Sequence, residues 1–427
     1  MIKTTLLLAL CAIGAAASAT ARYASDTVTT SDSVYVIPEQ TLYQKVTDIV
    51  NTVVDRRFND PKAPRFLFID QKHQYALGIG GYFRMVNGLE FDGLIPDSRD
   101  AGFSVASIPI PNTDYENSQY SLAFNSSTIY LNLLGSNRKL GPFSLYLSAK
   151  FDNSTYALEA DRVYLNVWNL TLGYASSTFN DDPSKAPQID GSGPNGSSFL
   201  STILARYTWN ATPSWRFAVS VEKPEVQATV PVGLKVGSQR SPTVPAFIQY
   251  QWNGGRSHVR LSGMIRPMNY MDTVRTHHYT AYGWGIQLSG PLALSPWLTW
   301  YYQLVYGRGI ANRISDLSVL NVDLVPNPSR PNTLQALPLY AIYTAAKVTF
   351  RPNLYAAVIY SHARLFSQNG YRPPEGYKMS HQVVLNLFWD VTPDLQLALE
   401  YNYGRKLAMD NRSGHANRIN TLVQLTF

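Results

Sequence analysis

The sequence has very little cysteine, because Cys11 is the only one among 427 residues. Cys11 falls inside the first 21 residues, which carry the features of a cleaved signal peptide. The predicted mature chain therefore has no thiol, and this excludes disulfides, cysteine-containing metal sites and cysteine nucleophiles. A chain without thiols also suits transit through an oxidising compartment.

Charged residues are scarce as well, at 15% of the chain against about 25% in typical soluble domains. The formal net charge is +7, and the basic residues are spread along the chain. A dispersed, modest charge does not predict a nucleic-acid partner. We therefore expect neither an ordinary soluble domain nor nucleic-acid binding.

Long apolar runs are missing after residue 21, where no segment approaches the roughly 18 residues that a membrane-spanning helix needs. Only helices and closed barrels satisfy every backbone polar group in lipid, so a closed β-barrel is the remaining way to cross a membrane. Aromatic residues make up 12% of the chain, with 28 tyrosines. This composition fits strands with one apolar and one polar face.

The N-terminus predicts export. Lys3 precedes a short apolar segment over residues 5–17, and two A-x-A patterns follow, the second ending at Ala21. This is the arrangement of a secretory signal peptide. We predict a signal peptide over residues 1–21, cleaved near Ala21.

Residues 22–60 are predicted to form a periplasmic extension that contains a short amphipathic helix. Within residues 41–57, apolar side chains are spaced by 4, 3 and 4 residues, at Leu42, Val46, Ile49 and Val53. That spacing gives a helix one apolar seam. The helix could plug or edge a larger structure, or it could pair with copies of itself in a symmetric assembly.

Residues 61–427 are the predicted barrel domain, and from about residue 74 they alternate with a period of two, which is typical of β-strands. Leu395, Leu397 and Leu399 fall on one face, for example, whereas Gln396 and Glu400 fall on the other. The alternation predicts an all-β, antiparallel transmembrane barrel of about 16 strands, an even number as expected for such proteins. The predicted strands are 74–86, 118–134, 141–151, 156–167, 170–178, 200–209, 215–223, 244–252, 257–266, 279–289, 297–307, 338–350, 354–365, 379–389, 395–405 and 417–427.

The connections and the tryptophans give the barrel an orientation. Short turns alternate with mostly long loops, as in outer-membrane barrels. Seven of the eight tryptophans lie close to short turns, which predicts an aromatic girdle at one rim. The last strand ends on Phe427, and a terminal aromatic residue resembles the signal read by the barrel assembly machinery. The predicted long loops are 87–117, 179–199, 224–243, 267–278, 308–337, 366–378 and 406–416.

The polar face of the predicted strands is rich in basic residues, and the acids assigned to it are chiefly Glu222 and Glu400. Rings of Arg and Lys favour anions in pores, and 16 strands leave a water-filled lumen. These side chains could line an anion-preferring pore, or they could lie in a packed interior. The predicted pore-lining basic residues are Arg84, Lys150, Arg162, Arg206, Arg216, Arg260, Arg266, Lys347 and Arg418.

The loop over residues 179–199 is rich in Gly, Pro and Ser and carries Asp181, Asp182 and Asp190. If this loop folds into the lumen, its acids would face basic wall residues and constrict the channel. It could instead be a surface loop with Asp at turn positions.

Enzyme motifs are absent from the sequence. None of the seven His occurs at a metal-binding spacing, and neither a G-x-S-x-G elbow nor a P-loop is present. We therefore expect no catalytic residues, no metal and no cofactor. A lipase- or protease-like barrel enzyme with a rim site, and a plugged barrel acting as an adhesin or structural protein, remain the alternatives.

Several segments resemble the DcaP-like porin family, over roughly residues 60–427. They include Ile79-Gly80-Gly81-Tyr82-Phe83-Arg84, Ser107-Ile108-Pro109-Ile110-Pro111, Trp168-Asn169, Ala175-Ser176-Ser177-Thr178-Phe179, Ile189-Asp190 and Gly193-Pro194-Asn195. The resemblance implies a 16-stranded, usually trimeric outer-membrane channel for small anions such as dicarboxylates, with an N-terminal helical extension. The expected partners are outer-membrane lipid, two further copies of the chain, small anionic solutes and the barrel assembly machinery.

Overall fold

The computed structural model describes residues 66–69, 75–91, 102–110, 118–124, 126–137, 139, 141–151, 157–372 and 376–427. The predicted signal peptide (1–21) and the predicted extension with its helix (22–60) lie outside the described residues. Among the residues described, no helix is long and apolar enough to cross a membrane.

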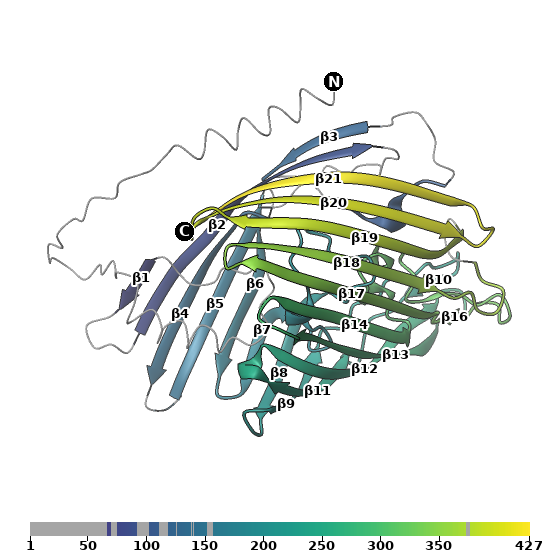
Figure 1. Cartoon of the computed structure of the whole chain (residues 1–427). Helices are drawn as coiled ribbons and strands as arrows, with labels where there is room; N and C mark the ends of the chain where they lie inside the picture. The colour runs from purple at the N-terminus through teal and green to yellow at the C-terminus, as the bar shows by residue number, and fades with distance from the viewer. Residues whose placement is uncertain are drawn as a thin grey trace, which may run out of the picture. The chain divides into compact units, whose positions relative to one another are not determined.

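Antiparallel strands close into a 16-stranded barrel (Figure 1), which confirms the predicted fold class. The sheet has 19 named strands, but β3 and β4 together fill one barrel position beside β2. The short strands β1 and β10 only extend the pairing of β2 and β12. The strands are β1 (Phe66–Ile69), β2 (Tyr75–Phe91), β3 (Ser118–Ala123), β4 (Thr128–Asn137), β5 (Gly141–Phe151), β6 (Leu158–Val167), β7 (Leu170–Ser176), β8 (Ser201–Asn210), β9 (Trp215–Glu222), β10 (Leu234–Val236), β11 (Val244–Trp252), β12 (Ser257–Asp272), β13 (His277–Ala293), β14 (Leu298–Arg308), β17 (Pro338–Arg351), β18 (Leu354–Leu365), β19 (Tyr377–Asp390), β20 (Leu395–Ala408) and β21 (Ser413–Thr426).

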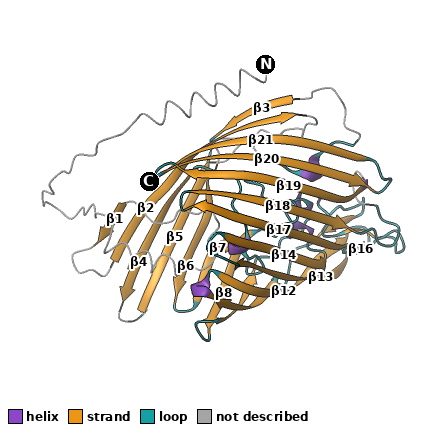
Figure 2. Cartoon of the chain, in the orientation of Figure 1, coloured by secondary structure: helices purple, strands orange, loops and turns teal. Residues whose placement is uncertain are grey.

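The loops carry the remaining elements (Figure 2). A separate two-stranded sheet joins β15 (Val325–Pro326) to β16 (Leu334–Gln335). Five short 3₁₀ turns are η1 (Val105–Ser107), η2 (Asp182–Ser184), η3 (Asn253–Gly255), η4 (Ala311–Arg313) and η5 (Leu317–Leu320).

Barrel closure joins the two ends of the described chain. β2 pairs with β21 from Tyr82 opposite Thr426 to Phe91 opposite Asn417. Phe427 continues this ladder, because its backbone exchanges hydrogen bonds of 2.8 and 2.9 Å with Gly81. The terminal aromatic residue is therefore part of the seam.

The period-two pattern separates two environments. On β12, Ile265 is 62% exposed to the outside, whereas its neighbour Arg266 is 1% exposed and points inward. On β20, Leu399 is 51% exposed and Glu400 is fully buried. Side chains alternate between faces of a strand, so the apolar set covers the outside of the barrel and the polar set fills the inside.

Two predicted long loops are wrong. Residues 267–278 and 406–416 largely continue their strands and leave tight turns at 273–276 and 409–412. Pro267 lies between the β11 pairing, which ends at Ile265, and the β10 pairing, which begins at Tyr270. A proline there interrupts no ladder on that side of β12, so it does not end the strand.

The tryptophans lie on the outer surface, where all of them except Trp284 are near a short turn. Trp168 is 67% exposed within the turn between β6 and β7, and Trp389 lies one residue before the end of β19. Trp215 packs against Tyr250 on the neighbouring strand, with ring centroids 5.0 Å apart. This arrangement matches an interfacial aromatic girdle.

Candidate functional site in the lumen

The segment between β7 and β8 (177–200) crosses the barrel interior. The Asn195 N–H donates to Gln382 of β19 (2.8 Å), and the Gly196 N–H donates to Ser361 of β18 (2.7 Å). Both acceptors are buried on the inward face. Because β18 and β19 lie far around the barrel from β7, the segment spans the lumen.

Asp181 is fully buried against the wall of β12 and β13. It accepts hydrogen bonds from Ser289 Oγ (2.7 Å) and from the His258 ring (2.9 Å), and Arg260 Nε lies 3.6 Å away. Burial raises the pKa of a carboxyl, but Arg260 and His258 outweigh burial and hold the pKa of Asp181 well below its ordinary value. Asp181 is an anchor of the loop on this wall.

Asp182 faces the opposite wall. Arg162 of β6 lies 3.7 Å from its carboxylate, and Lys185 of the same loop lies 3.2 Å from it. On the neighbouring strand β5, Lys150 forms an ion pair of 3.2 Å with Asp161 of β6. Basic and acidic groups therefore face each other between the loop and the wall of β5 and β6.

Asp190 occupies a third buried position. Its carboxylate accepts the backbone N–H groups of Phe103 and Ser192, both at 3.0 Å. The Ile189 and Asp190 N–H groups donate to Glu400 of β20, at 2.7 and 3.0 Å. Burial raises the pKa of Asp190 to about 7, with Arg418 opposing this effect and Glu400 adding to it.

Segment 102–110 also packs inside the barrel, which the sequence analysis did not predict. Lys406 of β20 donates to the Ala106 carbonyl (2.7 Å), and the Ala106 N–H donates to Asp316 (2.6 Å). Asp316 also accepts from Tyr377 Oη at 3.1 Å. Burial raises the pKa of Asp316 to about 6.

The segment between β14 and β17 (309–337) is the third inward segment, and it too was not predicted. Its Asp323 pairs with Arg266 of β12 at 3.2 Å, and its Arg313 pairs with Glu222 of β9 at 3.2 Å. All four side chains are buried. Two wall charges predicted to face water are therefore used to hold a loop.

The nine predicted basic residues lie on inward strand positions but do not form one ring. Three of them contact the 177–200 segment: Arg84 through the Ile189 carbonyl, Arg162 through Asp182, and Arg260 through Asp181 and the Asn180 carbonyl. Arg206 donates to the carbonyl of Ser176, the last residue of β7, at 3.4 Å. Arg418 pairs with Glu90, Arg266 with Asp323 and Lys150 with Asp161. Arg216 packs near Phe247, and Lys347 lies over the Tyr355 ring at 4.4 Å.

The predicted set of inward acids was incomplete. Glu90 is buried on β2 opposite Arg418, but the predicted strand stopped at residue 86. Extending the same parity by four residues would have placed Glu90 on the inward face. Asp316 and Asp323 carried no such signal, because they lie in a loop. Among the described residues, no group of three His, Cys, Asp or Glu is arranged to hold a metal ion.

The basic side chains along β5–β8 are more exposed to solvent than those on the wall of β12 and β13, where Asp181 anchors the 177–200 segment. The Lys150 side chain is 42% exposed and that of Lys185 is 19% exposed, and Arg206 is half-buried. A stacked row of tyrosines runs beside them across β4–β6, with Tyr130, Tyr146 and Tyr164 centroids 5.8 and 5.2 Å apart. We define Lys150, Lys185 and Arg206 as the candidate eyelet.

The comparisons with known proteins support the architecture. No family model and no curated protein matches the chain. The crystal structure of the outer membrane channel DcaP of Acinetobacter baumannii aligns with a TM-score of 0.71 and 17% identity, covering 84% of this chain and 99% of that one. Salmonella typhi OmpF, in complex with daunomycin, aligns with a TM-score of 0.53 and 10% identity, covering 84% of this chain and 99% of that one. Outer-membrane expressed OmpT of Vibrio cholerae aligns with a TM-score of 0.52 and 11% identity, covering 84% of this chain and 100% of that one. The chain therefore has the fold of the outer-membrane porins.

Proposed function

We propose that the protein is a water-filled diffusion pore of the Gram-negative outer membrane with a preference for small anions such as carboxylates and dicarboxylates. The observation that supports this preference is the candidate eyelet, in which Lys150, Lys185 and Arg206 keep solvent contact beside the anchored loop. Basic side chains at a constriction attract anions and repel cations. The preference comes from the field of these groups and from the lumen width, without catalysis or a cofactor.

The other proposed partners follow from the barrel. Its apolar outer face contacts outer-membrane lipid, and the assembly is a homotrimer, as the resemblance to trimeric porins implies. Assembly into the membrane uses the C-terminal strand and Phe427. The chain is exported by a signal peptide cleaved near Ala21.

A reversal potential measured across a planar bilayer in a KCl gradient tests the anion preference. We predict that Lys150→Glu together with Arg206→Glu moves the reversal potential towards the cation-selective side, because two positive charges of the candidate eyelet become negative. Arg240→Glu together with Arg275→Glu is the matched control, since both residues are exposed in connections between strands. Equal reversal potentials for the wild type and the eyelet variant would contradict the proposal.

A plugged barrel that acts as an adhesin or structural protein is the second candidate. It is favoured by one observation, that three loop segments pack inside the barrel and are fixed by buried pairs such as Arg313–Glu222. Single-channel recording separates the two candidates. Discrete conductance steps from the purified protein support the pore, and a silent, folded barrel supports the plug.

A further inference from the structure

On the outer surface of three neighbouring strands, β18, β19 and β20, the outward side chains change from apolar to basic at the same height. Towards the short-turn rim, their outward positions are occupied by apolar or aromatic side chains. Nearer the opposite rim, basic residues occupy some of these positions, at His362 and Arg364 on β18, His381 on β19 and Arg405 on β20, whereas Met379 and Leu407 beyond them are apolar. The outward residues before this change are Leu354, Ala356, Val358 and Tyr360 on β18, Trp389, Leu387, Leu385 and Val383 on β19, and Leu395, Leu397, Leu399, Tyr401 and Tyr403 on β20. We call Arg364 and Arg405 the rim cations, and the imidazoles of His362 and His381 lie between them.

The strand register brings the two imidazoles and Arg405 together. His362 lies opposite His381, and His381 lies opposite Arg405. The two imidazole rings are 4.4 Å apart between centroids. Residues directly opposite on paired strands have adjacent side chains, so the three form a continuous row along the outer wall.

Tyrosine hydroxyls orient the two imidazoles. Tyr340 Oη lies 3.0 Å from His362 Nε2, and Tyr360 Oη lies 2.9 Å from His381 Nδ1. Hydrogen bonds of this length fix a ring that would otherwise rotate. The two imidazole rings in the row therefore have fixed orientations.

Among the residues that the structure describes, neither guanidinium group of the rim cations has a carboxylate partner. Arg364 lies over the Phe366 ring at 4.7 Å, and Arg405 donates to Ser413 Oγ at 3.4 Å. Within the described part of the chain, no carboxylate lies within ion-pair distance of either one. A charge at the edge of a lipid environment is costly unless an opposite charge approaches it. An anion from outside the chain would therefore stabilise Arg364 and Arg405.

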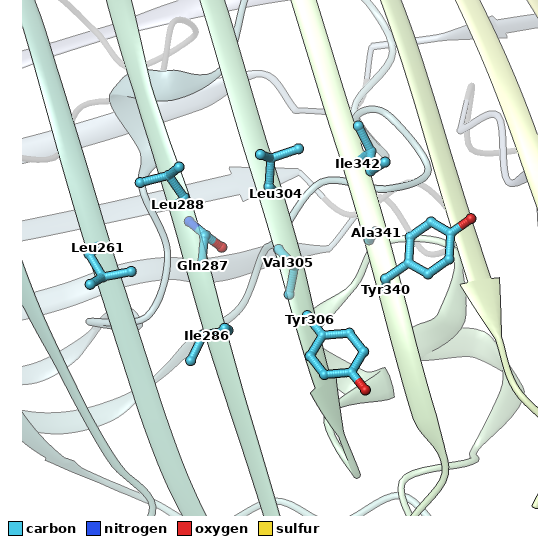
Figure 3. Close-up of a pocket in the computed structure, with 10 residues that line it drawn as sticks. All are labelled: Leu261, Ile286, Gln287, Leu288, Leu304, Val305, Tyr306, Tyr340, Ala341 and Ile342. Atoms are coloured by element: carbon cyan, nitrogen blue, oxygen red, sulfur yellow. The ribbon is translucent and has the colours of Figure 1, made fainter.

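An apolar groove lies on the same outer face (Figure 3), and its residue Tyr340 contacts His362 beside the rim cations. It has a volume of about 310 Å³ and runs across β12, β13, β14 and β17. Tyr340 and Ile342 form its edge on β17, and Ile342 lies opposite His362 on β18. Its other lining residues are Leu261, Ile286, Gln287, Leu288, Leu304, Val305, Tyr306 and Ala341. The rim cations and the groove therefore form one amphipathic surface.

We propose that this surface binds a phosphorylated lipid of the outer leaflet. The phosphate contacts Arg364 and Arg405, with His381 between them, and an acyl chain lies in the groove beside Tyr340. Charge complementarity selects this occupant, since phosphate pairs with guanidinium through two parallel hydrogen bonds. Basic pockets at a membrane interface recognise lipid head groups in this way. The site faces lipid, so it is independent of the proposed pore selectivity.

Native mass spectrometry of the detergent-purified full chain, titrated with lipid A that carries two phosphates, tests the proposal. We expect Arg364→Gln with Arg405→Gln to weaken binding about tenfold or more, which corresponds to ~1.4 kcal/mol. The matched control is Arg240→Gln with Arg275→Gln, which removes the same charge from exposed loops and leaves binding unchanged. Lipid A with one phosphate binds the wild type more weakly, and phosphatidylcholine does not compete.

Three results would overturn the proposal. One is equal lipid A binding by the wild type and the rim variant, and another is an equal loss in the control variant. The third is a change from trimer to monomer in the rim variant without loss of lipid, because the occupant of the surface would then be a second copy of the chain. Circular dichroism and an unchanged single-channel conductance show that the variants remain folded, so a loss of binding is a property of the surface.

Discussion

At the residue scale, two loop carboxyls have pKa values raised towards neutrality. Asp190 contacts Phe103 and Ser192 through backbone N–H groups and lies near Arg418 and Glu400. Burial dominates these effects and raises its pKa to about 7, and burial likewise raises the pKa of Asp316 to about 6. Asp181 differs, because two cationic partners hold its pKa below the ordinary value. The 177–200 segment thus contains one carboxyl whose pKa is raised, Asp190, and one whose pKa is lowered, Asp181.

A pH dependence of stability follows for Asp190. Between about pH 4 and pH 7 the folded chain binds more protons at this carboxyl than the unfolded chain, so the free energy of unfolding falls as pH rises through this range. Asp190→Asn removes the titration. We predict that, relative to the wild type, Asp190→Asn is less destabilising at pH 8 than at pH 5, by on the order of 1 kcal/mol.

Urea unfolding in detergent, followed by tryptophan fluorescence at both pH values, measures this difference. Asp410→Asn is the control, because Asp410 is exposed and its pKa is lowered, so it does not titrate between pH 5 and pH 8. An Asp190→Asn effect of the same size at both pH values would show that Asp190 does not titrate in this range.

At the element scale, the 177–200 segment is held against the wall by backbone as well as by side chains. A Cβ added at Gly196 would collide with the carbonyl oxygens of Ile342 and His362. Gly196 also donates to Ser361. Only glycine allows the segment to approach the backbone of β17 and β18 this closely.

Gly196→Ala should therefore detach this part of the segment and widen the lumen. The clash costs about 1–3 kcal/mol, which is enough to release a segment while the barrel stays closed. We predict a larger and noisier single-channel conductance. Gly191→Ala is the control, since a Cβ there meets only Ser126 Oγ at 3.7 Å, and it should conduct like the wild type. Identical traces for all three proteins would contradict the proposed constriction.

The sequence predicted the strands better than the lumen, for a physical reason. Strand parity is local, so the alternation along β20 was enough to place Glu400 inward and Leu399 outward. The contact between Asp316 and the Ala106 N–H joins segments more than 200 residues apart, and no local pattern encodes it. The rim cations were likewise hidden, because the parity analysis followed the inward face only.

At the scale of the whole molecule, the barrel depends on a seam between β2 and β21. Phe427 contributes two backbone hydrogen bonds to Gly81 at the end of that seam, and its side chain is 38% exposed on the outside. The backbone bonds persist with any residue at this position. The aromatic ring is therefore not needed for these backbone bonds, which is compatible with the proposed recognition by the assembly machinery.

Phe427→Ala separates these two tasks. The variant keeps the backbone ladder, so the purified chain should refold in detergent to the same heat-modifiable form as the wild type. In cells, loss of the terminal ring should reduce the folded protein in outer-membrane fractions severalfold, measured by the unheated gel band. Phe427→Tyr is the control and should assemble normally, because it keeps an aromatic ring. If Phe427→Ala failed equally in detergent and in cells, the ring would stabilise the seam itself, and the proposed recognition would be wrong.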